Sequence, residues 1–166
     1  LAWLFGACQF RAEGALSMTE IDPDTVEARI RHSFARQGAM ETLGATLSSI
    51  SQGVVEIEME FDPKLTQQHG FLHAGVISAA LDTACSYAAY TVTTPEVSLL
   101  TIEFKVNLMS PGRGERFLFR GEITKPGSNI IVADGRGYAL TDGPAKLIAS
   151  MTSTMMVIRG REGISG

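Results

Sequence analysis

The sequence predicts an α+β fold: a curled antiparallel sheet of about six strands wrapped around one long central helix, with a short helix before the sheet. Two observations carry this prediction. Residues 72–92 form an alanine-rich segment that is apolar on nearly every side, and runs of alternating apolar and polar residues stand before and after it. A helix that is apolar all round must be buried, and six strands cover it only if their sheet curls around it.

Size and charge narrow the class of protein. A chain of 166 residues suits a single domain with a sizeable core. Its 14 basic and 18 acidic residues give a net charge of −4, which argues against nucleic acid as a partner because nucleic-acid readers carry a basic surface. The sequence contains no basic amphipathic helix of the kind that binds a membrane surface. The charged fraction of 19% is below the usual quarter and indicates extra buried surface, as in an oligomer.

The chain is interpreted as one domain over residues 18–160 with a tail at 161–166. Residues 1–17 are interpreted as an extension or a misplaced start, because the methionine that follows opens a sequence typical of a cytosolic protein. A strand or tail that packs on a neighbour is the alternative. The two cysteines, Cys8 and Cys85, cannot build a disulfide framework. Cys85 lies in an apolar run and is expected to be a reduced core residue, which predicts a cytoplasmic location.

The first element is predicted to be a helix. The residues Asp-Pro-Asp at 22–24 are typical of a helix start, since they combine a capping acid with proline in the first turn. Val26, Ile30 and Phe34 recur at helical spacing, and the helix is expected to end near Gly38.

Alternation with period two predicts the strands. Residues 54–61 alternate apolar side chains with glutamates and, with the segment 43–50 before the turn, are expected to form a hairpin. Residues 98–108 are expected to extend the sheet across a two-fold axis, because sheet edges pair. Four later runs closed by turn residues predict an antiparallel meander: 101–108, 117–124, 130–140 and 145–158.

The segment 72–92 also has the length of a membrane span, about 31 Å as a helix. Asp82 lies at its centre, and a carboxylate in mid-membrane costs at least about 2.5 kcal/mol on insertion scales. The segment is therefore predicted to be a core helix rather than a transmembrane one.

A motif marks the start of this helix. Residues 67–75 read QQHGFLHAG, and an acid, Asp82, follows nine residues after His73. The order of elements and this spacing resemble the hotdog-fold thioesterases, most of all the PaaI-like branch of phenylacetic acid degradation. The signature of that family is His-Gly-Gly at the start of the central helix, with an acid nine residues after the histidine. The resemblance covers residues 24–158 and includes the Met-Ser-Pro end of a strand. The first glycine of the signature is Ala74 here, which keeps the backbone N–H.

The resemblance implies hydrolysis of acyl-coenzyme A thioesters at the interface of a homodimer. Two such dimers are expected to pair into a homotetramer, with the dimer alone as the alternative. No cofactor is implied, because coenzyme A is part of the substrate. Small helix residues, with Phe61, Tyr87 and Phe104 as candidate pocket walls, suit a medium-chain or aromatic acyl group. The alternatives are a non-catalytic acyl-CoA-binding or sensing module and a hydroxyacyl-thioester dehydratase.

Asp82 is the first candidate catalytic residue. A carboxylate in an apolar helix either has partners or faces a cavity, because burying it unpaired is expensive. It is interpreted as the catalytic group, which either attacks the thioester carbonyl or acts as base on a water. The alternative is a structural aspartate that is hydrogen-bonded to backbone or threonine.

The helix start is the second candidate. Unpaired N–H groups there suit a developing oxyanion, and the resemblance assigns Ala74 as the main donor with Gly75 as the candidate second one. Gly70 and Gly75 equally suit a tight turn and close packing. His73 is a candidate for orienting the carbonyl or for holding the loop. His69 precedes it by four residues, but no third ligand accompanies them, so no metal is expected.

The remaining candidates come from the resemblance and from charge. Gln67, with Gln68 as the register alternative, matches the position that binds the thioester oxygen. Thr101 matches a position that holds the lytic water, although threonine is also a good strand former. Four polar residues are candidates for the phosphates of coenzyme A, with solvated surface as the alternative: Arg113, Lys125, Asn129 and Arg136.

His73 and Asp82 lie far apart on the predicted helix. Nine helical residues give about 900° of rotation and about 13.5 Å of rise. The two side chains therefore lie on opposite sides of one helix. If both serve one site, they come from different chains, and a two-fold dimer makes two such sites.

Overall fold

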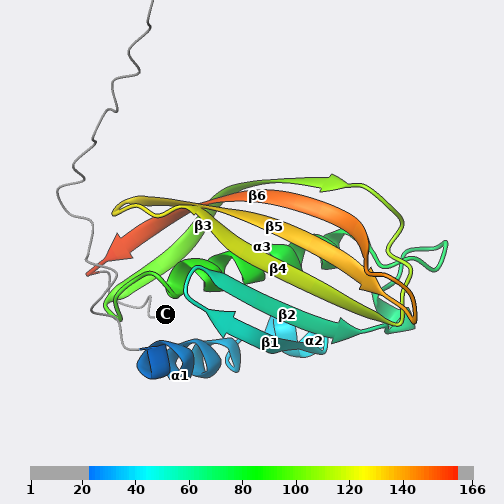
Figure 1. Cartoon of the computed structure of the whole chain (residues 1–166), viewed down its shortest axis with the longest axis horizontal. Helices are drawn as coiled ribbons and strands as arrows, with labels where there is room; N and C mark the ends of the chain where they lie inside the picture. The colour runs from blue at the N-terminus through cyan, green and yellow to red at the C-terminus, as the bar shows by residue number, and fades with distance from the viewer. Residues whose placement is uncertain (1–22, 161–166) are drawn as a thin grey trace, which may run out of the picture.

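The computed structural model describes residues 23–160. One antiparallel sheet of six strands, in the order β1-β2-β4-β5-β6-β3, curls around the helix α3 (Figure 1). The two shorter helices, α1 and α2, lie beside the β1 edge of the sheet. The expected fold class, a hotdog arrangement of a curled sheet around one long helix, is confirmed.

The bounds of the elements refine the expected ones. The helices are α1 (Pro23–Phe34), α2 (Gly38–Thr42) and α3 (Ala74–Tyr90), with a short 3-10 helix η1 (Pro63–Leu65). The strands are β1 (Ala45–Ser51), β2 (Val54–Glu60), β3 (Val97–Leu108), β4 (Arg116–Lys125), β5 (Ile130–Leu140) and β6 (Lys146–Arg159). The expected central helix over 72–92 is thus two residues too long at each end. The helices α2 and η1 were not expected, because they are too short to show a period.

Small residues let the sheet approach α3 closely. The inner face of β2 buries its apolar side chains while its glutamates stay more exposed. On the neighbouring strand, a Cβ added at Gly121 would lie 2.4 Å from the backbone of Ala84 in α3. Because Ala84 is fully buried, neither side of this contact has room to move. The strand needs glycine at this point for the sheet to wrap around the helix.

The helix α1 holds the C-terminal end of α3. The guanidinium group of Arg29 donates hydrogen bonds to the carbonyls of Tyr90 and Thr93, which a helix end leaves without intrahelical partners. The Tyr87 hydroxyl donates to Ser33 Oγ at 3.1 Å. The expectation that Tyr87 forms a pocket wall is therefore wrong, because its ring belongs to the core and is 1% exposed.

The expected meander is wrong for β3. The strands β4, β5 and β6 follow one another as neighbours, but β3 pairs with β6 at the far edge of the sheet. The chain therefore crosses from that edge to the middle of the sheet between β3 and β4. Turn residues predict where strands end but not which strands pair, because pairing depends on contacts between distant parts of the chain.

Several expectations concern the ends of the chain. The proposed extension at 1–17, the tail at 161–166 and Cys8 lie outside the described residues, and the domain boundaries stay predictions. Cys85 is free and buried, as expected. Among the helices of residues 23–160, none is long and apolar enough to cross a membrane.

Gly121→Ala is expected to lower the free energy of unfolding by about 1–3 kcal/mol or more, because the new Cβ meets helix backbone rather than a movable side chain. Gly38→Ala is the control, since no atom lies within 4 Å of its Cβ position. Urea unfolding of both variants measures the difference. Equal midpoints for Gly121→Ala and wild type would contradict the close contact.

Candidate active site

The helix α3 begins with a side-chain cap. His73 is the N-cap residue, and its Nδ1 accepts a hydrogen bond of 2.9 Å from the Gly75 N–H. The ring therefore carries its proton on Nε2, because Nδ1 acts as the acceptor. His73 is exposed, so this Nε2–H is open to a partner outside the protomer.

The cap leaves one backbone donor free at the start of α3. The Gly75 N–H is taken by His73, and the His73 carbonyl accepts from Val76 and Ile77. The N–H of Ala74, the first residue of α3, has no hydrogen-bond partner among residues 23–160. It lies at the positive end of the helix dipole. Of the two donors implied by the resemblance, Ala74 is the one available to a developing oxyanion.

The loop before α3 folds back on itself. The Gln67 N–H donates to the Phe71 carbonyl at 2.9 Å, and Gly70 closes the turn with a φ of 78°. Gln67 is half-buried, and its side-chain oxygen accepts from the His69 N–H, which leaves the amide nitrogen as a donor. Gln68 is exposed, and its amide nitrogen lies 3.4 Å from the His69 ring. Gln67 is therefore the glutamine held at the start of the helix.

Asp82 lies near the middle of α3 and is half-buried. The Thr101 hydroxyl of β3 donates to Asp82 Oδ1 at 2.8 Å, and Ser86 Oγ lies 3.4 Å from that hydroxyl. Burial raises the pKa of Asp82 above its usual range, while the hydroxyls of Thr101 and Ser153 lower it. No cationic side chain of the described part of the chain pairs with this carboxylate.

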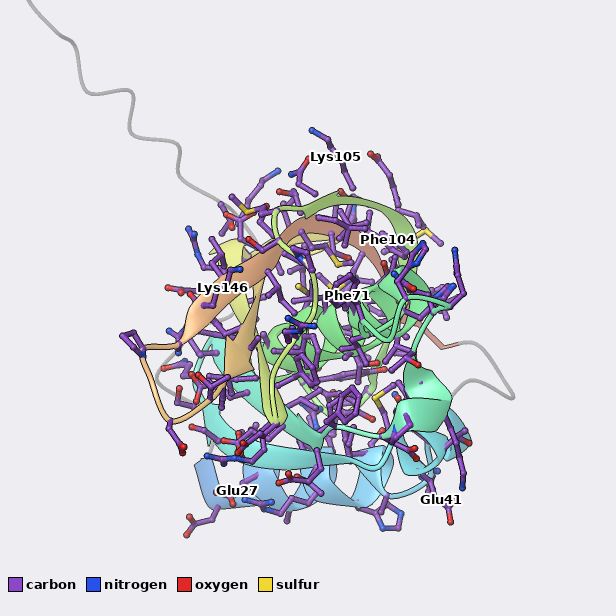
Figure 2. The ribbon with its side chains drawn as sticks, turned by 90° about the vertical axis from the view of Figure 1, so that its right-hand side faces the viewer. Glu27, Glu41, Phe71, Phe104, Lys105 and Lys146 are labelled. Atoms are coloured by element: carbon purple, nitrogen blue, oxygen red, sulfur yellow. The ribbon has the colours of Figure 1, made fainter. Side chains whose placement is uncertain are left out.

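The carboxylate lies beside the free edge of the sheet. β3 pairs with β6 alone within residues 23–160, and its large apolar side chains stay exposed: Leu100 41%, Ile102 54%, Phe104 44% and Leu108 52%. Phe104 stands opposite Ser153 in the β3–β6 register, on the inner face. Figure 2 shows Lys105 pointing outward from β3 and Phe104 on the inner side. Such an edge is typical of a strand that pairs with another chain.

One protomer does not bring Asp82 and the helix start together. α3 is continuous from Ala74 to Tyr90, so Asp82 lies about 12 Å along the axis from Ala74. A site that uses both groups needs a second chain, as the spacing predicted.

The candidates for coenzyme A binding lie in separate places. Arg113 lies beside the start of α3, with its guanidinium carbon 5.5 Å from the centre of the Phe71 ring. Lys125 ends β4 and Asn129 lies in the turn after it, at the opposite end of the sheet (Figure 1). Of these three candidates, only Arg113 lies near the start of α3 in the same protomer.

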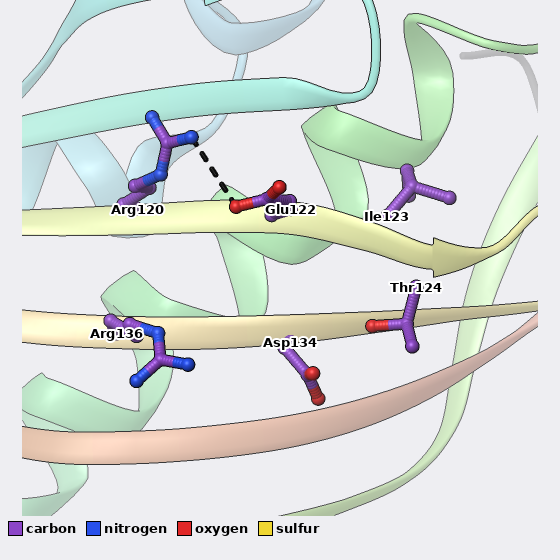
Figure 3. Close-up of a pocket in the computed structure, with 6 residues that line it drawn as sticks. All are labelled: Arg120, Glu122, Ile123, Thr124, Asp134 and Arg136. Atoms are coloured by element: carbon purple, nitrogen blue, oxygen red, sulfur yellow. Dashed lines mark hydrogen bonds and ion pairs between the residues drawn. The ribbon is translucent and has the colours of Figure 1, made fainter.

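Arg136 lies on the outer face of β5, away from α3. It lines a hollow with Arg120, Glu122 and Asp134 (Figure 3). Arg120 is already paired with Glu122 at 3.3 Å and with Glu56 at 3.0 Å, and these carboxylates raise its pKa. This hollow is therefore separate from the Asp82 site.

No metal cluster is formed by the described residues: none of their His, Cys, Asp and Glu side chains gather in groups of three or more that could hold an ion. The analysis of the sequence missed Ser153, a fully buried serine on β6 that faces Asp82. Its signal was weak: on the inward-facing positions of an alternating strand it is the one polar residue between the apolar Met151 and Met155.

The topology and the helix start define a hotdog protein of the thioesterase type, and the comparisons with known proteins agree. The family model of the thioesterase superfamily matches residues 69–146, which include Asp82. A thioesterase family protein from Silicibacter pomeroyi has a solved structure with 50% sequence identity and a TM-score of 0.80; the match covers 81% of this chain and 99% of that one. This chain belongs to the thioesterase superfamily.

Two further relatives carry informative names. The medium/long-chain acyl-CoA thioesterase YigI of Escherichia coli is 28% identical over 130 residues, which are 69% of this chain and 82% of that one. The PaaI protein from the phenylacetic acid degradation operon of Escherichia coli has a TM-score of 0.73, covering 83% of this chain and 96% of that one, at 15% identity. At that identity the likeness to PaaI is one of fold alone.

His73→Ala is expected to lower the free energy of unfolding by about 1 kcal/mol, because the Gly75 N–H loses its acceptor. His73→Asn places a side-chain oxygen at the N-cap and is expected to recover most of the loss, since asparagine is among the best capping residues. Urea unfolding compares the three proteins. An unchanged midpoint for His73→Ala would show that the cap contributes nothing.

Proposed function

We propose that this protein hydrolyses acyl-coenzyme A thioesters, with Asp82 of one chain as the reacting carboxylate and the Ala74 N–H of another as the oxyanion donor. The observation that carries the proposal is the placement of Asp82. It is an ionisable group in an apolar helix, beside the free edge of the sheet, and it is held by the Thr101 hydroxyl at 2.8 Å without a cation. Burying such a group costs stability, and perturbed carboxylates gather at functional sites.

The proposed reaction breaks the C–S bond of the thioester and forms a C–O bond. In one route, Asp82 takes a proton from a water whose oxygen attacks the carbonyl carbon. In the other, an Asp82 oxygen attacks, and water then cleaves the acyl-enzyme anhydride. Both routes place negative charge on the carbonyl oxygen, which the Ala74 N–H at a helix N-terminus stabilises. Coenzyme A leaves as a thiolate that takes up a proton.

The proposed acyl group is medium-chain or aromatic. Phe104 stands exposed on the inner side of β3, and the small Ala79 lies partly open on α3. A large apolar side chain and a small residue that are both partly exposed suit a flexible chain or a flat ring. Arg113, whose guanidinium lies over the Phe71 ring just before the helix start, is the proposed partner for a phosphate of coenzyme A, because the proposed oxyanion donor is at the same end of α3.

The proposed unit is a homodimer in which β3 pairs with its counterpart, and two dimers form the tetramer. The exposed apolar side chains of β3 and the free strand edge support the dimer. A second chain is also the means by which His73, Ala74 and Gln67 reach an Asp82 carboxylate.

Asp82→Asn is expected to lower kcat by at least about 10²-fold and to change KM much less, because coenzyme A is bound elsewhere. The activity of wild type needs the ionised carboxylate, so it should be lost as pH falls through the pKa of Asp82, which burial raises above that of an ordinary aspartate. Release of free thiol from a panel of acyl-CoAs measures both effects.

Asp134→Asn is the matched control, since Asp134 also accepts a threonine hydrogen bond, from Thr152 at 2.9 Å, but on the outer face of the sheet. It should keep full activity. A fully active Asp82→Asn would refute the assigned mechanism. A wild type that binds acyl-CoA without hydrolysing it would favour the sensing module, and hydration of an enoyl thioester would favour the dehydratase.

The two-chain site predicts complementation between inactive chains. Heterodimers of Asp82→Asn and His73→Ala chains contain one intact site, so their activity should rise above that of either parent. Light scattering is expected to show at least a dimer. An active monomer, or confirmed heterodimers with no recovery while both parents are impaired, would contradict the cross-chain arrangement.

A further inference from the structure

Ser153 is a buried hydroxyl without a completed hydrogen bond. The residue is 0% exposed on β6. Its Oγ is one of three buried side-chain polar atoms of residues 23–160 that lack a partner, and the other two belong to Arg29. Burying an unsatisfied hydroxyl costs free energy that an alanine at the same place would not. The hydroxyl therefore requires an explanation.

The register of the sheet places this hydroxyl beside Asp82. Ser153 and Met155 are successive inner-face residues of β6, and Met155 stands opposite Thr101. Ser153 is thus one inner position along from the threonine that already binds the carboxylate. Both hydroxyls lower the pKa of Asp82 against the larger effect of burial.

The other ionisable groups near Asp82 do not stabilise its carboxylate. Cys85, one turn along α3, is neutral, because burial and then the charge of Asp82 raise its pKa to about 12. From the neighbouring strands, Glu103 and Lys105 are exposed on β3, and Asp134 lies on the outer face of β5. The inner-face residues of β2 and β4 are apolar. Hydroxyl groups are therefore what the sheet presents to the carboxylate within the described chain.

We infer that Ser153 is a positioning residue for Asp82: its hydroxyl rotates to donate a second hydrogen bond to the carboxylate. This inference rests on the proposed function of Asp82. One donor leaves the carboxylate free to turn about its terminal bond, whereas two donors from the neighbouring strands β3 and β6 fix its plane. The pair also favours the ionised form that the reaction needs, and so opposes the effect of burial.

Ser153→Ala and Ser153→Cys test the inference. Alanine removes the donor and leaves a small space, while cysteine fills the space with only a weak donor. The control is Ser150→Ala, on the same strand but on the outer face, where Ser150 Oγ accepts from the Asn107 amide at 3.3 Å. The pH profile of kcat is measured for each protein, with thermal unfolding to confirm folding.

Both Ser153 variants are expected to lose about tenfold in kcat at neutral pH and to need a higher pH for half-maximal activity, because a donor to the charged carboxylate is lost. KM should change little, and Ser150→Ala should follow wild type. Ser153 variants that are folded but overlay the wild-type pH profile would overturn the inference. A shift for alanine alone would also overturn it, because volume rather than the donor would then be the cause.

A second measurement separates this inference from the proposed function. The NMR signal of the Asp82 carboxyl carbon is assigned by comparison with Asp82→Asn. Its chemical shift is then followed against pH in wild type and in Ser153→Cys. A higher midpoint in Ser153→Cys supports the hydrogen bond even if no acyl-CoA is hydrolysed. Equal midpoints in an active enzyme reject the role of Ser153 and leave the proposed function standing.

Discussion

The structure depends on the burial of one apolar helix by a sheet whose edge strands, β1 and β3, each pair on one side only within residues 23–160. The strands approach α3 closely because glycine and alanine meet at the contact, with Gly121 against the backbone of Ala84. A six-stranded sheet that curls without closing cannot cover every side of a helix. The side of α3 toward β3 is the one left partly open, and Asp82 and Ser86 lie on it. The candidate catalytic carboxylate therefore lies where the burial of α3 is incomplete.

The two ends of α3 differ in how their backbone groups find hydrogen-bond partners, and the difference has a chemical consequence. At the C-terminal end, Arg29 reaches carbonyls more than 60 residues away and satisfies them. At the N-terminal end, His73 satisfies the Gly75 N–H and leaves that of Ala74 free. One end is thus closed by the protein, while at the other a backbone donor has no partner among residues 23–160.

The sequence predicts the parts of this fold that depend on local patterns. Alternation over 54–61 identifies a strand, the alanine-rich run identifies α3, and the motif places His73 at the start of α3 and Asp82 near its middle. The position of β3 beside β6 could not be predicted in this way, because turn residues indicate where strands end but not which strands pair. Charged residues in turns look alike wherever the turn lies, so the separation of Arg113 from Lys125 appears only in three dimensions.

Ser153 shows the same limit within the candidate site. A serine in a strand forms no motif and disturbs the apolar period by one position only. Its meaning comes from β6 lying next to β3, which brings its hydroxyl to the carboxylate that Thr101 binds. The sequence could identify Asp82 because a carboxylate in an apolar helix is costly, whereas a buried hydroxyl costs far less and gives a weaker signal.

The partners of the carboxylates differ between the two faces of the sheet. On the outer face, Glu56 is paired with Arg120 at 3.0 Å, and a guanidinium stabilises a negative charge strongly. Among residues 23–160, Asp82, on the inner side, accepts a hydrogen bond from the Thr101 hydroxyl and pairs with no cation. A cation beside Asp82 would keep it ionised but would also weaken it as a base and as a nucleophile, because both roles need electron density at the oxygen. Neutral donors orient the carboxylate while burial keeps its proton affinity high. This combination suits the proposed role of Asp82, which must be ionised near neutral pH and still attack or take up a proton.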